Sequence, residues 1–297
     1  MTFKIGLALG GGAARGLAHL GVIKALVEEG IPIDIISGTS IGSIVAAIYG
    51  ANPNIYEAID RIAEYIHSPL FDRARLDLIK ESSLEPQSYF GTLKKYVKTG
   101  LFFAVSLRRN SFISEETFRK NLEQILPKGH IEECPIKLGL VSMNLNTAEE
   151  EVSTSGEIIE KVMASCAIPG IFPPIEFENS KFVDGSWINP VPVSTAINLG
   201  AKFTIAIDVA PGMDSRDKEL NGFDITLKAA EGSRSILKSI SLSKADIALS
   251  VDLMDIHWAD FTQIERCIEE GELTIRNSIE VIKKKLFWKK IKSRLPI

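Results

Sequence analysis

The stretch that decides the fold runs from Ile5 to Gly42 and reads IGLALGGGAARGLAHLGVIKALVEEGIPIDIISGTSIG. It contains two apolar runs, Ile5–Leu9 and Ile33–Ile36. Each run is followed by a glycine-rich turn and then by a segment of helical character, Leu17–Glu29 after the first run and Ile41–Ala51 after the second. Short apolar runs bounded by turns predict buried strands. Their alternation with helices predicts an α/β fold with a mostly parallel sheet and helices on both faces.

The turn after the second run is Gly38–Gly42 (GTSIG), a Gly-x-Ser-x-Gly motif. Between a strand and a helix, this motif holds its serine, Ser40, on a strained and exposed turn. The turn after the first run, Gly10–Gly16 (GGGAARG), would direct backbone N–H groups into the same crevice at the carboxyl edge of the sheet. An exposed serine hydroxyl beside free amides is the minimum requirement for acyl transfer. The two turns together predict a serine hydrolase.

Nucleotide binding is the rival interpretation of the first glycine-rich turn. A phosphate-binding P-loop requires a lysine that this turn lacks. The spacing of Gly10, Gly12 and Gly16 is one residue away from the dinucleotide-binding fingerprint. The acidic residue near the expected distance, Asp34, begins the second predicted strand, whereas the fingerprint needs it at the end of that strand. A nucleotide-binding function is therefore disfavoured.

A third segment, Lys181–Ser186 (KFVDGS), predicts a short strand that ends in Asp184 on a tight turn. The first glycine-rich turn, the GTSIG motif and this late Asp-Gly turn, in that order, resemble the patatin-like phospholipases. The resemblance includes SCAIPGIFPP at Ser165–Pro174 and NPVP at Asn189–Pro192. It covers most of residues 4–275.

The resemblance implies a three-layer α/β/α fold, the patatin-like fold, and a catalytic Ser–Asp dyad. Ser40 corresponds to the nucleophile of the family and Asp184 to the base that accepts its proton. A serine hydroxyl needs such a base to act as a nucleophile near neutral pH. The resemblance also implies an oxyanion hole built from backbone amides of the first turn: Gly10, Gly11, Gly12 and Ala13.

Other residues of these motifs have supporting roles. Arg15 would hold the glycine-rich turn in shape or offset the charge of anionic head groups. Small residues keep the turns tight: Gly16, Gly38, Gly42 and Gly185. The chain departs from the family pattern twice, since its first turn is one residue longer than in plant-type members and Ser186 stands where Gly or Ala is usual. A hydrogen bond from the Ser186 hydroxyl to Asp184 would lower the pKa of that carboxyl group.

A Ser-His-Asp triad is the alternative to the dyad. His19 follows Gly16 by three residues and could approach the glycine-rich turn, although a structural position on the first helix is favoured. His257 comes last in the chain order, as the triad histidine does in α/β-hydrolases. Both arrangements stay open at the level of the sequence.

Composition narrows the class of protein. The chain has 297 residues, of which 45% are hydrophobic, enough for one large core. Its net charge of −4 argues against a nucleic-acid partner. The apolar runs are too short to cross a bilayer, and we expect no cleaved leader before the first strand. The three cysteines have no metal-like spacing, and no acidic calcium loop is visible, so we expect a cytoplasmic protein without metal or cofactor.

We expect one catalytic domain over residues 1–275, with residues 52–130 as a helical insert. Aromatic and charged residues are interleaved in the insert, which predicts amphipathic helices around a local core or, alternatively, a lid over the active site. Its most apolar segment, Leu101–Val105, is the candidate for lipid contact. Residues 276–297 form a basic, amphipathic tail with two open interpretations: an anchor on anionic membranes or a solvated helix end.

The alternation of strands and helices continues along the rest of the chain. The predicted strands are Ile136–Asn144, Glu150–Thr154 and Phe203–Val209, and the predicted helices are Glu157–Ala167 and Val191–Asn198. Together with the motifs, this pattern predicts a lipid acyl hydrolase that acts on phospholipids, lysophospholipids or related esters through an acyl-enzyme. The expected partners are a lipid ester substrate and, through the tail, an anionic membrane surface. Two alternatives stay open: an acyltransferase or thioesterase on the same scaffold, and a non-catalytic lipid-sensing regulatory protein.

Overall fold

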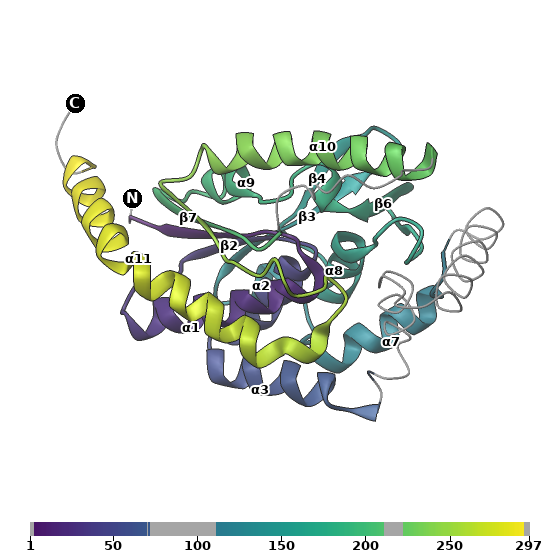
Figure 1. Ribbon diagram of the computed structural model, residues 1–297, viewed down its shortest axis with the longest axis horizontal. Helices are drawn as coiled ribbons and strands as arrows, with labels where there is room; N and C mark the ends of the chain where they lie inside the picture. The colour runs from purple at the N-terminus through teal and green to yellow at the C-terminus, as the bar shows by residue number, and fades with distance from the viewer. Residues whose placement is uncertain (1–2, 70, 72–110, 211–221, 294–297) are drawn as a thin grey trace.

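The computed structural model describes residues 3–69, 71, 111–210 and 222–293. These residues form three layers, with one sheet between two sets of helices (Figure 1). On one side of the sheet lie α9 (Val193–Asn198) and α10 (Gly222–Leu242). On the other side lie α1 (Ala18–Glu28), α2 (Ile41–Ala51), α8 (Ile158–Cys166) and α11 (Ile264–Lys292). The predicted α/β/α architecture is confirmed.

The centre of the sheet consists of parallel strands. In spatial order these are β8 (Ile247–Ser250), β7 (Phe203–Asp208), β1 (Ile5–Leu9), β2 (Ile35–Thr39) and β3 (Lys137–Asn144). Strands β1, β2 and β7 are buried along their entire length because helices cover both faces of the sheet. Three antiparallel strands extend it: β4 (Glu149–Ser153) and β6 (Ser180–Asp184) pair with β3, and β5 (Ile175–Phe177) pairs with β6.

Strand β3 determines where β2 and β6 end relative to each other. A strand has two edges for pairing, and β4 occupies one edge along the second half of β3. β2 pairs with the other edge and stops where Thr39 lies opposite Val141. β6 runs in the opposite direction along that same edge and stops where Asp184 lies opposite Ser142. The ends of two strands that are distant in sequence therefore meet head to head beside β3.

The predicted insert over residues 52–130 contains two described helices, α3 (Ile55–Ile66) and α7 (Glu115–Ile125). Both are amphipathic, with buried residues recurring every three or four positions on one face. The candidate lipid-contact segment Leu101–Val105 lies outside the described residues, so a lid at that segment stays a prediction.

The C-terminal tail is not a separate unit. Helix α11 is continuous from Ile264 to Lys292, so the domain boundary expected at residue 275 falls inside it. Ile275, Ile282 and Leu286 are buried because this face of the helix packs on the domain. The amphipathic pattern of the tail therefore reflects the packing of one face of α11 on the rest of the domain. None of the helices in the described ranges is long and apolar enough to cross a membrane.

Two glycines bring α11 and α1 into backbone contact. A Cβ atom at Gly21 would lie 1.9 Å from the carbonyl oxygen of Ile268. A Cβ atom at Gly271 would lie 2.1 Å from the carbonyl oxygen of Ala18. Real Cβ atoms do not approach oxygen so closely, so the crossing of these helices requires glycine at both positions.

Candidate active site

Ser40 lies on the sharp turn between β2 and α2, with φ of 55° and ψ of −126°. A residue with a side chain keeps such a conformation only where its surroundings enforce it. Close packing at the two flanking glycines enforces it here. A Cβ atom on Gly38 would lie 2.4 Å from the carbonyl oxygen of Gly42, and one on Gly42 would lie 2.2 Å from that of Leu9. Tight contact between β1, β2 and α2 thus holds Ser40 at the carboxyl edge of the sheet.

The hydroxyl group of Ser40 donates a hydrogen bond of 2.6 Å to Oδ2 of Asp184, 144 residues further along the chain. Asp184 is the last residue of β6, and its Oδ1 accepts the backbone N–H of Ser186 at 2.8 Å. Both carboxylate oxygens therefore have a partner, which fixes the orientation of the side chain. The two residues nominated as the dyad are in direct contact, whereas their catalytic roles stay predictions.

Burial changes the proton affinity of Asp184. The residue is 3% exposed, and loss of hydration raises the pKa of its carboxyl group above the ordinary value of 3.8. Hydrogen bonds from Ser40 and Ser186 act in the opposite direction without cancelling the effect of burial. The lowering expected from Ser186 is thus present, but the net shift of the pKa is upward. A higher pKa makes the carboxylate a stronger base near neutral pH.

Two further serines hold the backbone of Ser40 in place, and neither was assigned from the sequence. The Ser165 hydroxyl accepts the N–H of Ser40 at 3.0 Å and donates to the carbonyl of Val141 at 2.6 Å. The Ser43 hydroxyl donates to the carbonyl of Ser40 at 2.6 Å. Ser165 is the first residue of Ser165–Pro174, a stretch by which the sequence resembles the patatin-like phospholipases, and that resemblance was the signal that could have drawn attention to it. Nothing local to that stretch indicates which of its side chains reaches the end of β2.

The structure corrects two of the four amides expected in the oxyanion hole. The N–H of Gly10 donates to the carbonyl of Ile207 at 3.0 Å, and the N–H of Gly11 donates to that of Pro190 at 3.0 Å. A backbone amide carries a single hydrogen, so these two groups are already used. They hold the glycine-rich turn against β7 and the segment after β6.

The other two expected amides, those of Gly12 and Ala13, differ from the first two in their hydrogen bonding. Within the described part of the chain, neither N–H group has a backbone acceptor. Ala13 has φ of 49° and lines the same cavity as Ser40. The next residue, Ala14, donates its N–H to the carbonyl of Trp258 at 2.8 Å, which anchors this end of the turn. Gly12 and Ala13 are therefore the amides available to a developing oxyanion.

The histidines make contacts that favour the dyad over the triad. His19 is fully buried on α1, and its Nε2–H donates to the carbonyl of Gly10 at 2.7 Å. Burial lowers the pKa of His19 to about 4, so the ring is neutral near pH 7 and supports the glycine-rich turn. His257 accepts the N–H of Ala259 at Nδ1, at 3.2 Å. The hydroxyl of Ser40 donates to a carboxylate rather than to either imidazole.

Arg15 performs the first of the two roles expected of it. Its Nε–H donates to the carbonyl of Ile256 at 2.8 Å. This bond ties the glycine-rich turn to the segment that precedes α11. That segment, residues 256–259, accepts hydrogen bonds from both Arg15 and Ala14 and so supports the glycine-rich turn. The sequence did not indicate this contact.

An apolar cavity of about 130 Å³ opens onto Ser40. Its walls come from α2, α3 and α7, from the end of α8 and the segment after it, and from residues 13–17 and 258–261. The lining includes the aromatic side chains of Tyr65, Phe118, Phe172 and Trp258. Residues of the predicted insert therefore both complete the local core and form part of the wall of a cavity beside Ser40.

Comparison with known proteins places these motifs in context. A family profile described as "Patatin-like phospholipase" matches residues 7–197. "Lysophospholipase NTE1" of Mycosarcoma maydis is 33% identical over 206 residues, which are 69% of this chain and 10% of that protein. "Patatin-like phospholipase domain-containing protein ZK370.4" of Caenorhabditis elegans is 34% identical over 209 residues, 69% of this chain and 12% of that protein. The crystal structure of VipD from Legionella pneumophila aligns with 94% of this chain and 67% of its own, at 14% identity and a TM-score of 0.47. The chain thus spans about a tenth of the length of the two relatives compared by sequence.

Proposed function

This chain belongs to the patatin-like phospholipase family, and from that membership we propose that it is a serine lipid acyl hydrolase of the phospholipase or lysophospholipase type. The observation that carries the proposal is the 2.6 Å hydrogen bond from the Ser40 hydroxyl to Asp184. A hydroxyl group in contact with a buried carboxylate has the base that it needs to become a nucleophile. The apolar cavity beside it suits an acyl chain, because each buried methylene contributes about 0.8 kcal/mol.

In the first half-reaction, Oγ of Ser40 attacks the carbonyl carbon of the ester while Asp184 accepts the hydroxyl proton. Negative charge develops on the carbonyl oxygen, and the N–H groups of Gly12 and Ala13 stabilise it. Each well-placed donor of this kind contributes about 3–4 kcal/mol in comparable sites. The tetrahedral intermediate then collapses. The bond to the alcohol oxygen breaks, Asp184 gives its proton to that oxygen, and the acyl group stays on Ser40 as an ester.

In the second half-reaction, a water molecule attacks the acyl carbon while Asp184 accepts one of the protons of the water. Collapse of the second tetrahedral intermediate breaks the bond to Ser40 and returns that proton to Oγ. The products are the free fatty acid and the regenerated hydroxyl group. Asp184 thus acts twice as base and twice as acid. Its raised pKa is closer to neutral pH, which reduces the difference in free energy between its ionised and protonated forms there.

Labelling with a fluorophosphonate probe tests this proposal, because such probes react with activated serine hydroxyls. We expect phosphonylation at Ser40, located by peptide mass mapping, and release of fatty acid from 1-palmitoyl lysophosphatidylcholine by the unlabelled protein. Excess lysophospholipid should protect against labelling. Label on Ser43 or Ser165 would contradict the assignment of the nucleophile. Absence of both labelling and hydrolysis would point to the non-catalytic alternative, and preferential transfer to added alcohol or thiol acceptors to the transferase alternative.

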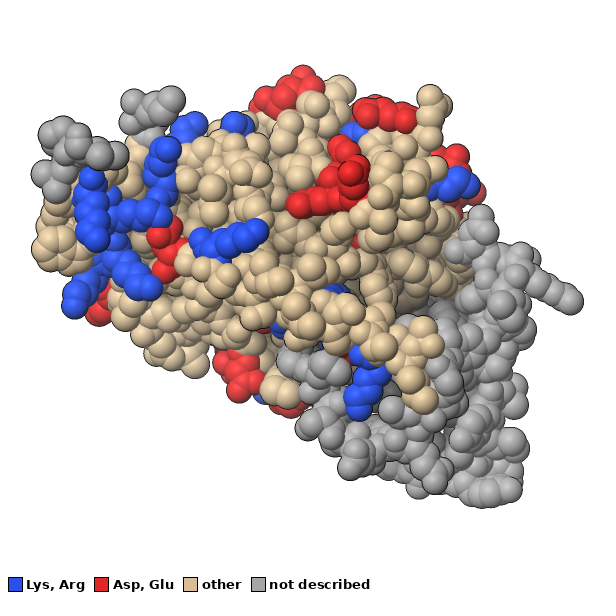
Figure 2. All heavy atoms as spheres, turned by 90° about the horizontal axis from the view of Figure 1, so that it is seen from above, with Lys and Arg blue, Asp and Glu red and all other residues tan. Residues whose placement is uncertain are grey.

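We further propose that the end of α11 contacts anionic lipid. Phe287 and Trp288 are 59% and 53% exposed, an uncommon position for two adjacent aromatic rings. Figure 2 shows Lys and Arg side chains gathered at the left end of the molecule, where α11 finishes. Lys284 and Lys292 are exposed there. Cations around exposed aromatic rings are typical of helices that lie in a membrane interface.

Replacing Phe287 and Trp288 together by serine is expected to lower binding to vesicles containing phosphatidylglycerol at least tenfold. The reason is that each buried aromatic ring contributes about 1.5–3 kcal/mol. Co-sedimentation measures the bound fraction. Leu273→Ser is the matched control, because Leu273 is also exposed, at 51%, near the other end of the same helix. Equal binding by the double variant and the control would reject the contact and favour a solvated helix end.

We also propose that the protein is cytoplasmic. The cysteines Cys134, Cys166 and Cys267 are all free. Free thiols are typical of proteins from a reducing compartment.

A further inference from the structure

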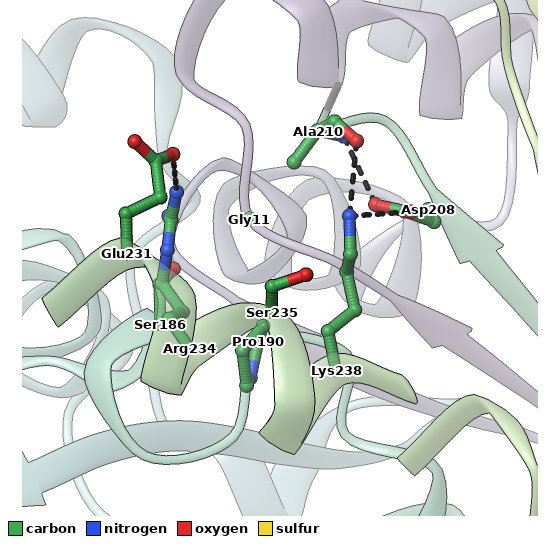
Figure 3. Close-up of a pocket in the computed structure, with 9 residues that line it drawn as sticks. All are labelled: Gly11, Ser186, Pro190, Asp208, Ala210, Glu231, Arg234, Ser235 and Lys238. Carbon is green, nitrogen blue, oxygen red and sulfur yellow. Dashed lines mark hydrogen bonds and ion pairs between the residues drawn. The ribbon is translucent and has the colours of Figure 1, made fainter. Parts of the chain in front are cut away.

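A polar pocket lies on the opposite side of the dyad from the apolar cavity. The apolar cavity is bounded by α2, α3 and α7, whereas this pocket is bounded by α10, which belongs to the other helical layer. Figure 3 shows Arg234, Ser235 and Lys238 rising from α10 toward the glycine-rich turn. Among the residues that the structure describes, the two pockets share no lining residue. An ester bound at Ser40 would thus have an apolar space on one side and a polar space on the other.

Gly11 and Ser186 connect the polar pocket to the dyad. Both line the pocket, and the N–H of Ser186 donates to Asp184. A Cβ atom at Gly11 would lie 3.3 Å from Cβ of Ser40 and would also meet the side chain of Ser186, so this part of the pocket wall is directly beside the dyad. The positive charge of Arg234 also lowers the pKa of Asp184, which is a further sign that the guanidinium group is near the dyad. The pocket is therefore within reach of the alcohol part of an ester that reacts at Ser40.

Two cations, Arg234 and Lys238, lie in the described part of the pocket wall. They differ in how far neighbouring groups already neutralise their charge. Nζ of Lys238 lies 2.8 Å from Oδ2 of Asp208 and donates to the carbonyl of Ala210 at 3.1 Å. Both charged side chains of this pair are largely buried, at 15% and 7% exposure, so the charge of Lys238 is already neutralised. This pair holds α10 against the end of β7 and is not available to a ligand.

Of the cations in the described part of the pocket wall, Arg234 is the one available to a ligand. Its Nη2 donates to Glu231 at 2.8 Å, and the two side chains are 33% and 48% exposed. Pairs of residues three apart on an exposed helix face contribute little, and a ligand can displace them. A guanidinium group presents several donors in one plane, a geometry that matches two oxygens of a phosphate group. Arg15 is not among the residues that line the pocket, and its Nε–H is bonded to the carbonyl of Ile256.

We propose that Arg234 binds the phosphate of the substrate's head group while the acyl chain of the same molecule occupies the apolar cavity. This inference rests on the proposed lipid hydrolase function and assigns its substrate class. The polar pocket is lined by charged and hydroxyl-bearing side chains, among them Arg234, Ser235 and Lys238, which suits an anionic group and disfavours a second acyl chain. A substrate with one acyl chain and a phosphate close to the ester fits both spaces. The geometry points to a lysophospholipid.

The test compares two substrates that share an acyl chain, 1-palmitoyl lysophosphatidylcholine and 1-palmitoyl glycerol. In Arg234→Gln we expect kcat/KM for the lysophospholipid to fall about 10- to 100-fold, mainly through KM, because a charged hydrogen-bonded pair is lost. We expect kcat/KM for 1-palmitoyl glycerol, which has no phosphate, to change less than twofold. Lys244→Gln is the matched control, since it removes one exposed cation just after α10 and outside the pocket.

Each outcome has one meaning. Equal losses for both substrates in Arg234→Gln would show a structural role and overturn the inference. Unchanged activity on the lysophospholipid would also overturn it, and so would a loss of the same size in Lys244→Gln. If the wild type hydrolysed 1-palmitoyl glycerol but not the lysophospholipid, the inference would fail while the proposed hydrolase function stood.

A binding measurement keeps the inference testable even if the wild type hydrolyses neither lipid, a result that would reject the proposed function itself. Glycerol 3-phosphate is titrated into Ser40→Ala and into Ser40→Ala/Arg234→Gln, with inorganic phosphate as the comparison ligand, and NMR shifts report binding. We expect glycerol 3-phosphate to bind the single variant about 10-fold more tightly than the double variant. Equal affinities would overturn the inference. Tighter binding of inorganic phosphate than of glycerol 3-phosphate would indicate a free-anion site instead of a head-group site and would also overturn it.

Discussion

Replacing Ser40 by alanine is expected to lower kcat for lysophospholipid hydrolysis by about 10⁶-fold, the scale seen when other serine hydrolases lose their nucleophile. Replacing Asp184 by asparagine is expected to lower it by about 10⁴-fold. The amide of asparagine preserves the shape of the side chain and can accept a hydrogen bond from Ser40, but it cannot take the proton. Because the two groups act as one unit, the double variant should be no slower than Ser40→Ala alone. Steady-state release of fatty acid measures all three variants.

The wild-type pH profile provides a second readout of the same prediction. Asp184 must be ionised to accept the proton, and burial raises its pKa above the ordinary 3.8. Activity should therefore fall as the pH decreases through that raised pKa, and the acid limb of kcat/KM should lie above pH 3.8. His257→Ala should keep most of the activity. Loss of activity in His257→Ala, with retention in Asp184→Asn, would replace the dyad with the histidine mechanism.

Replacing Gly21 by alanine is expected to lower the free energy of unfolding by about 2 kcal/mol. On an exposed helix the same change would stabilise the protein by about 1 kcal/mol, because alanine has the higher helix propensity. Here the new Cβ would lie 1.9 Å from the carbonyl oxygen of Ile268. Overpacking costs about 1–3 kcal/mol and sometimes more, and a clash with backbone belongs at the upper end of that range. Packing therefore outweighs propensity, and thermal melting should show a Tm lower by roughly 4–8 °C.

Gly30→Ala separates packing from backbone strain. Gly30 has φ of 69° and nothing within 4 Å of a new Cβ atom. Alanine at this position therefore clashes with no neighbour, and we expect only the left-handed backbone conformation to destabilise the fold, by about 1 kcal/mol. Gly271→Ala, on the other helix of the crossing, should be as destabilising as Gly21→Ala. If Gly21→Ala melted at or above the temperature of Gly30→Ala, α11 could not be packed on α1 as tightly as the structure has it.

Local elements of the fold were predictable from the sequence. β1 and α2 have the bounds that were predicted, Ile5–Leu9 and Ile41–Ala51. The second strand was placed two residues too early and ended too soon, because it finishes at Thr39. Ser37 and Thr39 are buried in it, and their hydroxyl groups donate to carbonyls 155 and 150 residues further along the chain. A search for apolar runs does not recognise polar strand residues whose partners are so distant.

The sequence by itself determined the α/β class, the strained turn that carries Ser40 and the acidic residue at the end of a later strand. Strands, helices and tight turns depend on residues that are neighbours in the chain, so their signals are local. Only the tertiary structure decided that β6 would meet the end of β2 beside β3, and so bring Asp184 to Ser40. It also decided which amides of the glycine-rich turn are available, because carbonyls from β7 and from the segment after β6 occupy two of them. Each amide has one hydrogen, and its partner is set by packing between segments that lie far apart in the chain.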